Sequence, residues 1–202
     1  SCTHTTSFIG GAIMTKKEIR QYFKAQRMAI DGRDRLKMDD LLLLQFQQLD
    51  FTDIQKVMSY WPLTHLGEPN TLLFTRYLSH LLPDLDLAYP VTDFATHILT
   101  AVRITEDTIY QTKELGLTEP KAGDIIEPEE LEVILVPMLC CDIDGYRVGY
   151  GKGFYDRYLS RCNPNVIRIG FSYFDPIEKI TDRDQYDVPL THCVTPDRIY
   201  EF

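Results

Sequence analysis

Apolar positions recur along the chain with two spacings, one typical of helices and one typical of strands. In residues 16–30 they recur every three or four positions, at Ile19, Phe23 and Ile30 among others, which predicts an amphipathic helix capped by Thr15. The basic residues of this segment fall on the opposite side: Lys16, Arg20, Lys24 and Arg27. Such a basic face is usually exposed to solvent, and for Arg20 a binding role is equally open. Further helices are predicted over residues 33–49, 70–82 and 155–162. The run of four leucines at 41–44 is expected to be buried because it is so apolar.

Short runs rich in β-branched and aromatic residues predict strands between these helices. The predicted strands cover residues 57–61, 85–90, 97–104, 108–112, 131–136, 166–171 and 199–202. Since strands alternate with helices, we expect an α/β fold with three α/β/α layers and a mostly parallel, Rossmann-like central sheet. Ligands of such sheets bind beyond the carboxyl ends of the strands, where the loop at 61–68 and the glycine-rich segment at 147–156 should lie.

Length and composition indicate one ordinary globular domain. The 202 residues are 44% hydrophobic and 25% charged, and no apolar stretch approaches the roughly 18 residues that span a bilayer, so no membrane partner is expected. We expect a single domain over residues 16–202, preceded by a tail at 1–15 that does not read as a secretion signal. We expect a monomer.

Charge and cysteine content narrow the function further. The net charge of −9 argues against nucleic acid as a partner, because binding to a phosphate backbone needs a basic face. The five cysteines show no C-x-x-C spacing, so neither a disulfide framework nor a zinc site is indicated, and a cytoplasmic location is expected.

The segment at 147–156 carries the clearest chemistry: it reads RVGYGKGFYD, with glycine at alternate positions between a strand and a helix. Glycine permits positive φ and lets backbone N–H groups approach an anion, while Arg147 and Lys152 add positive charge. The spacing matches neither a P-loop nor a dinucleotide fingerprint, because Tyr146 and Gly153 occupy positions where a P-loop has Gly and Ser or Thr. A phosphate-bearing ligand is one interpretation, and a plain glycine-rich turn is the other.

The motif extends into a longer pattern. Pro137, Asp142, Gly145, Arg147 and the run at 149–159, with Lys16, Ile19 and Arg20 upstream and the Glu68-Pro69-Asn70-Thr71 turn, resemble the 5-formyltetrahydrofolate cyclo-ligase (5,10-methenyltetrahydrofolate synthetase) family. The resemblance extends from about residue 16 to 202, and its specificity lies in the string R-x-G-x-G-K-G-x-Y-D-R.

This resemblance implies that ATP and Mg²⁺ drive the conversion of 5-formyltetrahydrofolate to 5,10-methenyltetrahydrofolate, with release of ADP and phosphate. In the family scheme the formyl oxygen takes the γ-phosphate and N10 closes on the activated carbon. Catalysis then needs charge neutralisation and in-line positioning, which the resemblance assigns to Lys152 and Arg147.

The resemblance also implies binding roles. The residues implied for ATP are Lys16, Arg20, Arg147, Gly149, Gly151, Lys152, Gly153, Phe154 and Tyr155. Those implied for the folate are Arg20, Leu63, Glu68, Tyr150, Gly151, Lys152, Gly153 and Phe154. Asp156 matches the magnesium-associated aspartate, although an acid in the first turn of a helix is also explained by the helix dipole.

Two features depart from this picture or leave it open. The family usually has a His-Asp pair near the C-terminus whose aspartate serves the metal, whereas this chain has His192-Cys193. Since a cysteine is a poor magnesium ligand, Asp187, Asp197 or water is expected to replace the aspartate. The aromatics Tyr60, Trp61 and Tyr89 are expected to pack in the core and not in the site.

Other functions stay open as well. One alternative is a sensor that binds a nucleotide or phosphate and has lost turnover. The cysteine at position 193, where the family has a metal-associated aspartate, suggests this alternative. Another is a sugar-phosphate isomerase or an acyl-transferase, because fold alone does not fix function. The basic residues, Glu68 and the complete glycine loop favour the cyclo-ligase over both.

Overall fold

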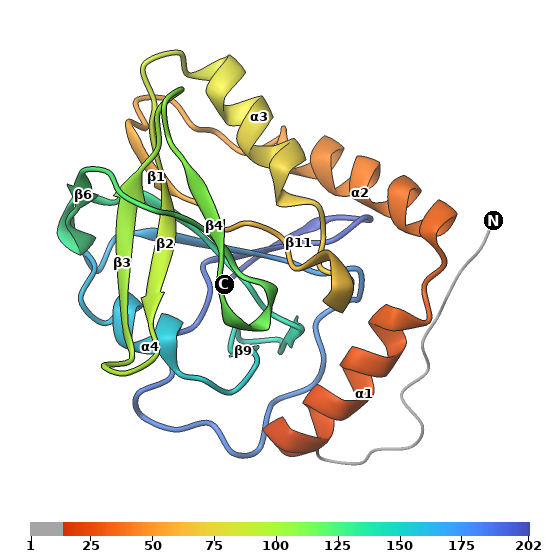
Figure 1. The fold of residues 1–202 in the computed structure, drawn as a ribbon. Helices are drawn as coiled ribbons and strands as arrows, with labels where there is room; N and C mark the ends of the chain where they lie inside the picture. The colour runs from red at the N-terminus through yellow and green to blue at the C-terminus, as the bar shows by residue number, and fades with distance from the viewer. Residues whose placement is uncertain (1–13) are drawn as a thin grey trace.

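The computed structural model describes residues 14–202, so most of the predicted tail at 1–15 lies outside the described residues. An eight-stranded sheet runs through the molecule in the order β12-β11-β10-β7-β1-β2-β3-β6 (Figure 1). Its strands are β1 (Lys56–Met58), β2 (Asp86–Asp93), β3 (Ile98–Arg103), β6 (Ile125–Ile126), β7 (Val133–Val136), β10 (Ile167–Phe171), β11 (His192–Val194) and β12 (Ile199–Glu201). The five strands from β11 to β2 in this order are parallel to one another. β12 at one end, and β3 and β6 at the other, are joined to them by antiparallel pairing, so the prediction of a mostly parallel sheet is confirmed.

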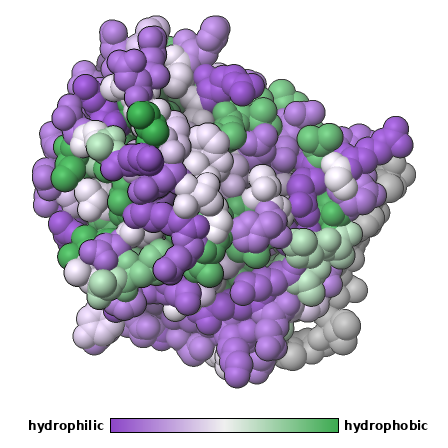
Figure 2. Space-filling view, viewed as in Figure 1, coloured by the Kyte–Doolittle hydropathy of each residue, from purple (hydrophilic) through white to green (hydrophobic). Residues whose placement is uncertain are grey.

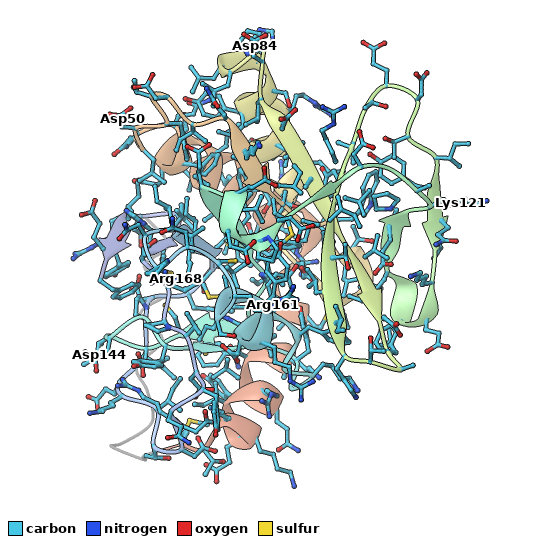
Figure 3. All side chains as sticks on the ribbon, turned by 90° about the vertical axis from the view of Figure 1, so that its left-hand side faces the viewer. Asp50, Asp84, Lys121, Asp144, Arg161 and Arg168 are labelled. Atoms are coloured by element: carbon cyan, nitrogen blue, oxygen red, sulfur yellow. The ribbon has the colours of Figure 1, made fainter. Side chains whose placement is uncertain are left out.

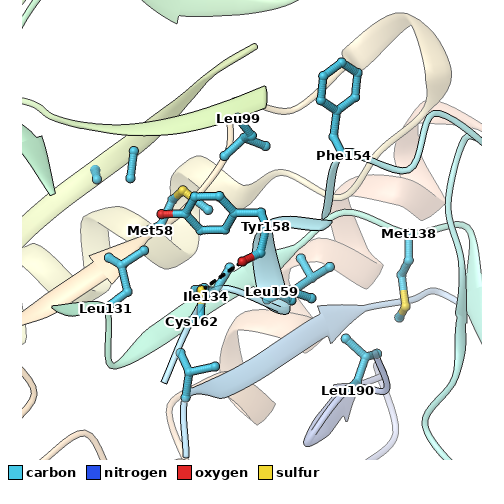
Figure 4. Packing of buried hydrophobic residues seen from close by; sticks show 14 of the residues in the cluster. Met58, Leu99, Leu131, Ile134, Met138, Phe154, Tyr158, Leu159, Cys162 and Leu190 are labelled. Carbon is cyan, nitrogen blue, oxygen red and sulfur yellow. Dashed lines mark hydrogen bonds between the residues drawn. The ribbon is translucent and has the colours of Figure 1, made fainter. Parts of the chain in front are cut away.

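Alternating side chains of the central strands divide the core into two layers. Val133 and Leu135 of β7 pack with α2 (Gly32–Phe46) and α3 (Thr71–Leu81) on one face of the sheet. Ile134 and Val136 pack on the other face with α4 (Phe154–Leu159), where Tyr158 lies beside Met58 and Leu131 (Figure 4). Because a strand points successive side chains to opposite faces, both faces are covered and the predicted α/β/α layers are confirmed.

Helix α1 (Lys16–Met28) lies apart from these two layers, on the same lower side of the molecule as α4 in Figure 1. Its Thr15 cap is confirmed, since the Thr15 hydroxyl accepts from the Glu18 N–H at 3.4 Å. Ile19 and Phe23 are buried against a hairpin of β8 (Cys140–Cys141) and β9 (Arg147–Val148). One prediction for α1 is wrong: Arg27 is buried and does not face solvent.

Two smaller features complete the fold. A second hairpin of β4 (Tyr110–Thr112) and β5 (Thr118–Pro120) lies beside β2. Short 3₁₀ helices occur at Thr64–Leu66 (η1), Glu114–Gly116 (η2) and Pro128–Glu130 (η3). Within residues 14–202, no helix is both long and apolar enough to cross a bilayer.

The surface is mainly polar. The face shown in Figure 2 is largely hydrophilic, with hydrophobic residues in separate groups. In Figure 3 the labelled side chains Asp50, Asp84, Lys121 and Asp144 lie at the periphery and point outward. The leucine run at 41–44 is only partly buried, against expectation: Leu42 is inaccessible, but Leu44 is 57% exposed because only one side of α2 meets the sheet.

Candidate active site

A cavity of about 1020 Å³ opens at the carboxyl ends of the parallel strands. Its walls come from α1, the loop after β1, the end of β2, the β4–β5 hairpin, the glycine loop with α4, and residues 184–188. This is the end of the sheet at which α/β proteins bind ligands, because loops from several strands converge there. The loop at 61–68 and the glycine loop meet in this cavity, as the sequence predicts.

Every residue that the sequence assigns to ATP, folate or metal lines this cavity. They are Lys16, Arg20, Leu63, Glu68, Arg147, Gly149, Tyr150, Gly151, Lys152, Gly153, Phe154, Tyr155 and Asp156. The structure therefore brings together residues that are more than a hundred positions apart, while the role of each stays a prediction.

The glycine loop uses its glycines in two ways. Gly151 and Gly153 have φ of 86° and 74°, in the left-handed region that side chains disfavour. A Cβ at Gly151 would lie 3.2 Å from Cζ of Arg20, so the loop also needs glycine to approach α1 closely. Because α4 has only six residues, positive charge at the loop comes mainly from side chains and only weakly from the helix dipole.

Arg147 is the buried cation of the loop. Its Nη2 lies 3.4 Å from Oδ1 of Asp156, and its Nη1 donates to the Pro137 carbonyl at 3.5 Å. Its Nε is buried without a hydrogen-bond partner among the described residues. Burial lowers the pKa of Arg147, while the charge of Asp156 opposes this shift. An anion in the cavity would offer acceptors to this guanidinium where water is largely excluded.

Two further cations come from α1 and one from the loop itself. Lys16 Nζ lies 2.6 Å from Oδ2 of Asp187 and 3.8 Å from Oδ2 of Asp184. Arg20 donates from Nε to the Gly149 carbonyl at 3.0 Å, which ties α1 to the loop. Lys152 is exposed, and within residues 14–202 nothing hydrogen-bonds or ion-pairs with it, so it can move to meet a ligand.

Glu68 marks a different end of the cavity. Its side chain is buried, with the residue only 5% exposed, and its Oε2 has no hydrogen-bond partner within the described part of the chain. Burial raises the pKa of Glu68 to about 7, while Arg27, the Tyr150 hydroxyl and the Leu63 backbone oppose this shift. An unpaired carboxylate oxygen in an apolar wall can accept hydrogen bonds from the N–H groups of a heterocyclic ligand.

Asp142, one of the residues that carry the resemblance, has no contact with the cavity. Its buried carboxylate accepts from the backbone N–H groups of Asp144, Tyr146 and Ile180, each at 3.0 Å, and from Nε of Arg183 at 2.9 Å. These bonds hold the β8–β9 turn immediately before the glycine loop, so Asp142 positions the loop from behind.

The sequence prediction missed part of the lining. Tyr60 and Trp61 line the cavity, although they were expected to lie in the core only. The buried Glu119 and the neighbours of Asp187, which are Asp184, Gln185, Tyr186 and Val188, line it too. The signal for Tyr60 and Trp61 was their place just after β1, where ligands of parallel sheets bind. The distant segment at 184–188 follows no strand directly and carries no local signal.

The structure places Cys193 away from the cavity, so the aspartate that the resemblance implies for the metal has no counterpart at this position. Cys193 is inaccessible in β11 and packs in the same core cluster as the free thiol of Cys141, and it does not line the cavity. Asp187 lines the cavity, whereas Asp197 does not. Of the two acids expected as replacements, Asp187 is thus the one in the cavity, and the next residue, Val188, donates its N–H to Oδ1 of Asp156 at 3.1 Å.

The donor chemistry at this point suits a hard cation. Asp156 and Asp187 are both close enough to Arg147 to influence its pKa, and both line the cavity. No group of three or more histidine, cysteine, aspartate or glutamate side chains gathers as a metal site within residues 14–202. Mg²⁺ commonly takes only one or two carboxylates and completes its shell with water and substrate phosphates, so two aspartates fit this ion.

Comparison with known proteins decides which family this architecture represents. The model of the 5-formyltetrahydrofolate cyclo-ligase family matches residues 12–196. The chain belongs to this family. The match covers almost the whole fold described above, including every residue that lines the cavity.

Individual cyclo-ligases support the assignment at lower coverage. The 5-formyltetrahydrofolate cyclo-ligase of Haemophilus influenzae is 32% identical over 100 residues, which cover 48% of this chain and 54% of that protein. The cyclo-ligase of Escherichia coli K12 is 30% identical over 91 residues, covering 44% of this chain and 50% of that one. The chain thus spans about half the length of the curated relatives it matches.

Solved structures extend the likeness to nearly the whole chain. The 5,10-methenyltetrahydrofolate synthetase of Aquifex aeolicus matches with a TM-score of 0.77 and 27% identity over 93% of both chains. The synthetase of Mycoplasma pneumoniae shares the fold, with a TM-score of 0.70 and 21% identity over 90% of this chain and 98% of that one. The cyclo-ligase fold is therefore the fold of this chain.

Proposed function

We propose that this chain is a ligase that cyclises 5-formyltetrahydrofolate to 5,10-methenyltetrahydrofolate with the use of ATP and Mg²⁺ and the release of ADP and phosphate. One observation carries the proposal: a single cavity joins a cation-lined glycine loop to an apolar, aromatic wall that contains the buried Glu68. A triphosphate suits the first end and a reduced pterin suits the second. The names of the family and of the relatives agree with this pairing.

At the phosphate end, four cations converge from two elements. Lys16 and Arg20 come from α1, and Arg147 and Lys152 come from the glycine loop. Gly149, Gly151 and Gly153 leave the backbone bare, so its N–H groups can approach phosphate oxygens together with Phe154 and Tyr155. We assign ATP binding to these residues.

At the folate end, Glu68 accepts hydrogen bonds from the pterin, and Leu63 packs against its ring. We assign Tyr150, Phe154 and the backbone of residues 151–153, which all line the cavity, to both ligands. Trp61 adds an aromatic surface that the sequence prediction left out of the site. Arg20 reaches both parts, since it bonds to the Gly149 carbonyl at the centre of the cavity.

Asp156 and Asp187 are the residues that would hold the magnesium ion. When bound, Mg²⁺ offsets the negative charge of the phosphates and fixes their orientation. In its absence Asp156 pairs with Arg147 and Asp187 pairs with Lys16, so the same carboxylates balance the charge of the phosphate-binding cations.

Catalysis in this proposal is electrostatic and positional. The chain needs no protein nucleophile, because the formyl oxygen itself attacks the γ-phosphate. Lys152 offsets the negative charge that moves with the phosphoryl group during transfer. Arg147, whose side chain is largely shielded from water, stabilises the same charge. The buried wall around Glu68 holds the folate so that its reacting groups stay aligned.

Cys193, the residue that suggested the sensor alternative, lies in the core, while Asp187 lines the cavity, and this supports the enzyme over the sensor. The decisive experiment gives purified protein 5-formyltetrahydrofolate and MgATP and follows the absorbance of the methenyl product and the release of phosphate. We expect both signals only when folate, ATP and magnesium are all present. Binding of ATP without folate-dependent turnover would favour the sensor.

A further inference from the structure

Arg27 is a buried arginine that uses all three of its nitrogen atoms within the protein. Only 2% of the residue is exposed. Its Nε donates to the Leu66 carbonyl at 2.9 Å, its Nη1 to the Met138 carbonyl at 3.2 Å, and its Nη2 to the Tyr150 hydroxyl. One side chain of α1 thus joins the loop before Glu68, the segment after β7 and the glycine loop, although it does not line the cavity itself.

Tyr150 connects Arg27 to Glu68. Its hydroxyl accepts a hydrogen bond from Arg27, and its interaction with the Glu68 carboxyl group lowers the pKa of that group. Oε2 of Glu68 is buried, lacks a hydrogen-bond partner among the described residues, and belongs to a residue of the cavity wall. The Tyr150 ring is held as well, with the Arg27 guanidinium 5.7 Å and Lys24 Nζ 5.8 Å from its centroid. Arg27, Tyr150 and Glu68 therefore form an ordered series that ends at a free acceptor.

The surroundings of Glu68 make Arg27 electrostatically important. Three tyrosines lie near enough for the charge of Glu68 to raise their pKa: Tyr60 in the loop after β1, Tyr150 in the glycine loop and Tyr155 in α4. Arg27 is the cation that opposes the effect of burial on the pKa of Glu68. Without it, the carboxyl group would have only neutral donors to stabilise its ionised form.

We infer that Arg27 is a positioning residue for the folate end of the cavity: it fixes the Tyr150 hydroxyl against Glu68 and supplies the buried positive charge that keeps Glu68 able to present a carboxylate. This inference rests on the proposed function for the identity of the ligand. Its physical content, the coupling of Arg27 to Glu68, concerns the free protein.

The test titrates the Glu68 carboxyl group in the ligand-free full chain by carbon NMR with labelled glutamate, assigned with Glu68→Gln. In the unaltered protein we expect a midpoint near the pKa of about 7. In Arg27→Met the midpoint should move to higher pH, whereas Arg27→Lys should restore most of it by keeping the charge. Arg33→Gln removes an exposed arginine at the start of α2 and should leave the midpoint unchanged.

A purely structural role for Arg27 predicts a different pattern. Arg27→Met would then lower the melting temperature but leave the Glu68 midpoint where it is, and this result would overturn the inference. Should Arg27→Met fail to fold, Tyr150→Phe provides the test. This substitution removes the hydroxyl that interacts with Glu68 and keeps the hydrogen bonds of Arg27 to the Leu66 and Met138 carbonyls. An unchanged midpoint in Tyr150→Phe would equally refute the coupling.

Folate binding separates this inference from the proposed function. At pH 7 we expect Arg27→Met to weaken 5-formyltetrahydrofolate binding by up to about tenfold, since raising a pKa by one lowers the ionised fraction by at most that factor. The loss should diminish at higher pH. A shifted midpoint in a protein that binds no folate would uphold the coupling and reject the function, whereas folate turnover with an unshifted midpoint would do the reverse.

Discussion

The ammonium group of Lys16 lies 2.6 Å from the carboxylate of Asp187. A residue proposed to bind phosphate and a residue proposed to bind the metal thus form an ion pair with each other. Arg147 and Asp156 repeat this relationship at 3.4 Å. Both pairs must separate, at least in part, when phosphates and a cation enter the cavity. The cavity is therefore electrostatically balanced before its ligands arrive, which limits the repulsion among its cations.

Removing Asp187 should change the metal dependence of nucleotide binding. Asp187→Asn frees Lys16, so we expect ATP to bind more tightly without magnesium and to gain less from its addition. Titration calorimetry with ATP in the presence and absence of Mg²⁺ measures both effects. Asp197→Asn is the matched control, because Asp197 is exposed and outside the cavity. If Asp197→Asn changed the magnesium dependence of ATP binding more than Asp187→Asn does, Asp197 and not Asp187 would be the metal-binding acid.

Lys152→Ala should abolish most turnover and leave the fold intact. The side chain is exposed and unbonded within the described residues, so its loss should not change the melting temperature. Loss of one charge-stabilising group in a transfer reaction lowers kcat by about 10²- to 10³-fold. Steady-state kinetics would show this, with Lys17→Ala on the exposed side of α1 as control. A nearly normal rate for Lys152→Ala would remove Lys152 from the catalytic role.

Glu68→Gln should weaken folate binding far more than ATP binding. The unpaired Oε2 accepts hydrogen bonds best as a carboxylate, and since its pKa is about 7 the unaltered protein should lose folate affinity as the pH falls through neutrality. Glu68→Gln should bind folate weakly at every pH. Separate titrations with folate and with ATP test this, and equal losses for the two ligands would indicate a structural role.

The same residue should make stability depend on pH. The pKa of Glu68 rises from 4.5 to about 7 on folding, so the native state keeps a proton that the unfolded chain releases. Stability should therefore fall as the pH rises from about 4.5 to 7, by on the order of 3 kcal/mol from this group. Glu68→Gln should remove this slope and be the more stable protein at pH 8. Urea unfolding at pH 5 and pH 8 measures the difference, and identical slopes for the two proteins would contradict it.

Patterns within a segment predicted most of the fold. The spacing of apolar residues located α1 to α3 to within three residues at each end, and alternation of strands with helices led to the parallel sheet. The strands β5, β6, β8, β9 and β11 were missed because strands of two or three residues have no period of their own. The leucine run was misjudged because the burial of α2 depends on its orientation, which composition does not encode.

The site was predictable where its residues are contiguous or belong to the family pattern, and not where long-range contacts decide. Arg27 follows Lys24 on a basic face, and nothing nearby in sequence shows that its partners lie 39, 111 and 123 positions away. Asp187 was one of two candidate acids until the structure placed it beside Asp156.

Asp142 illustrates how scaffolding can be mistaken for chemistry. Its carboxylate organises a turn behind the glycine loop through bonds to three backbone amides and to Arg183, without reaching the cavity. In a survey of loss-of-function alleles, substitutions of Asp142 would reduce activity as substitutions of Lys152 do. Only their sensitivity to temperature would distinguish a weakened framework from an impaired reaction step.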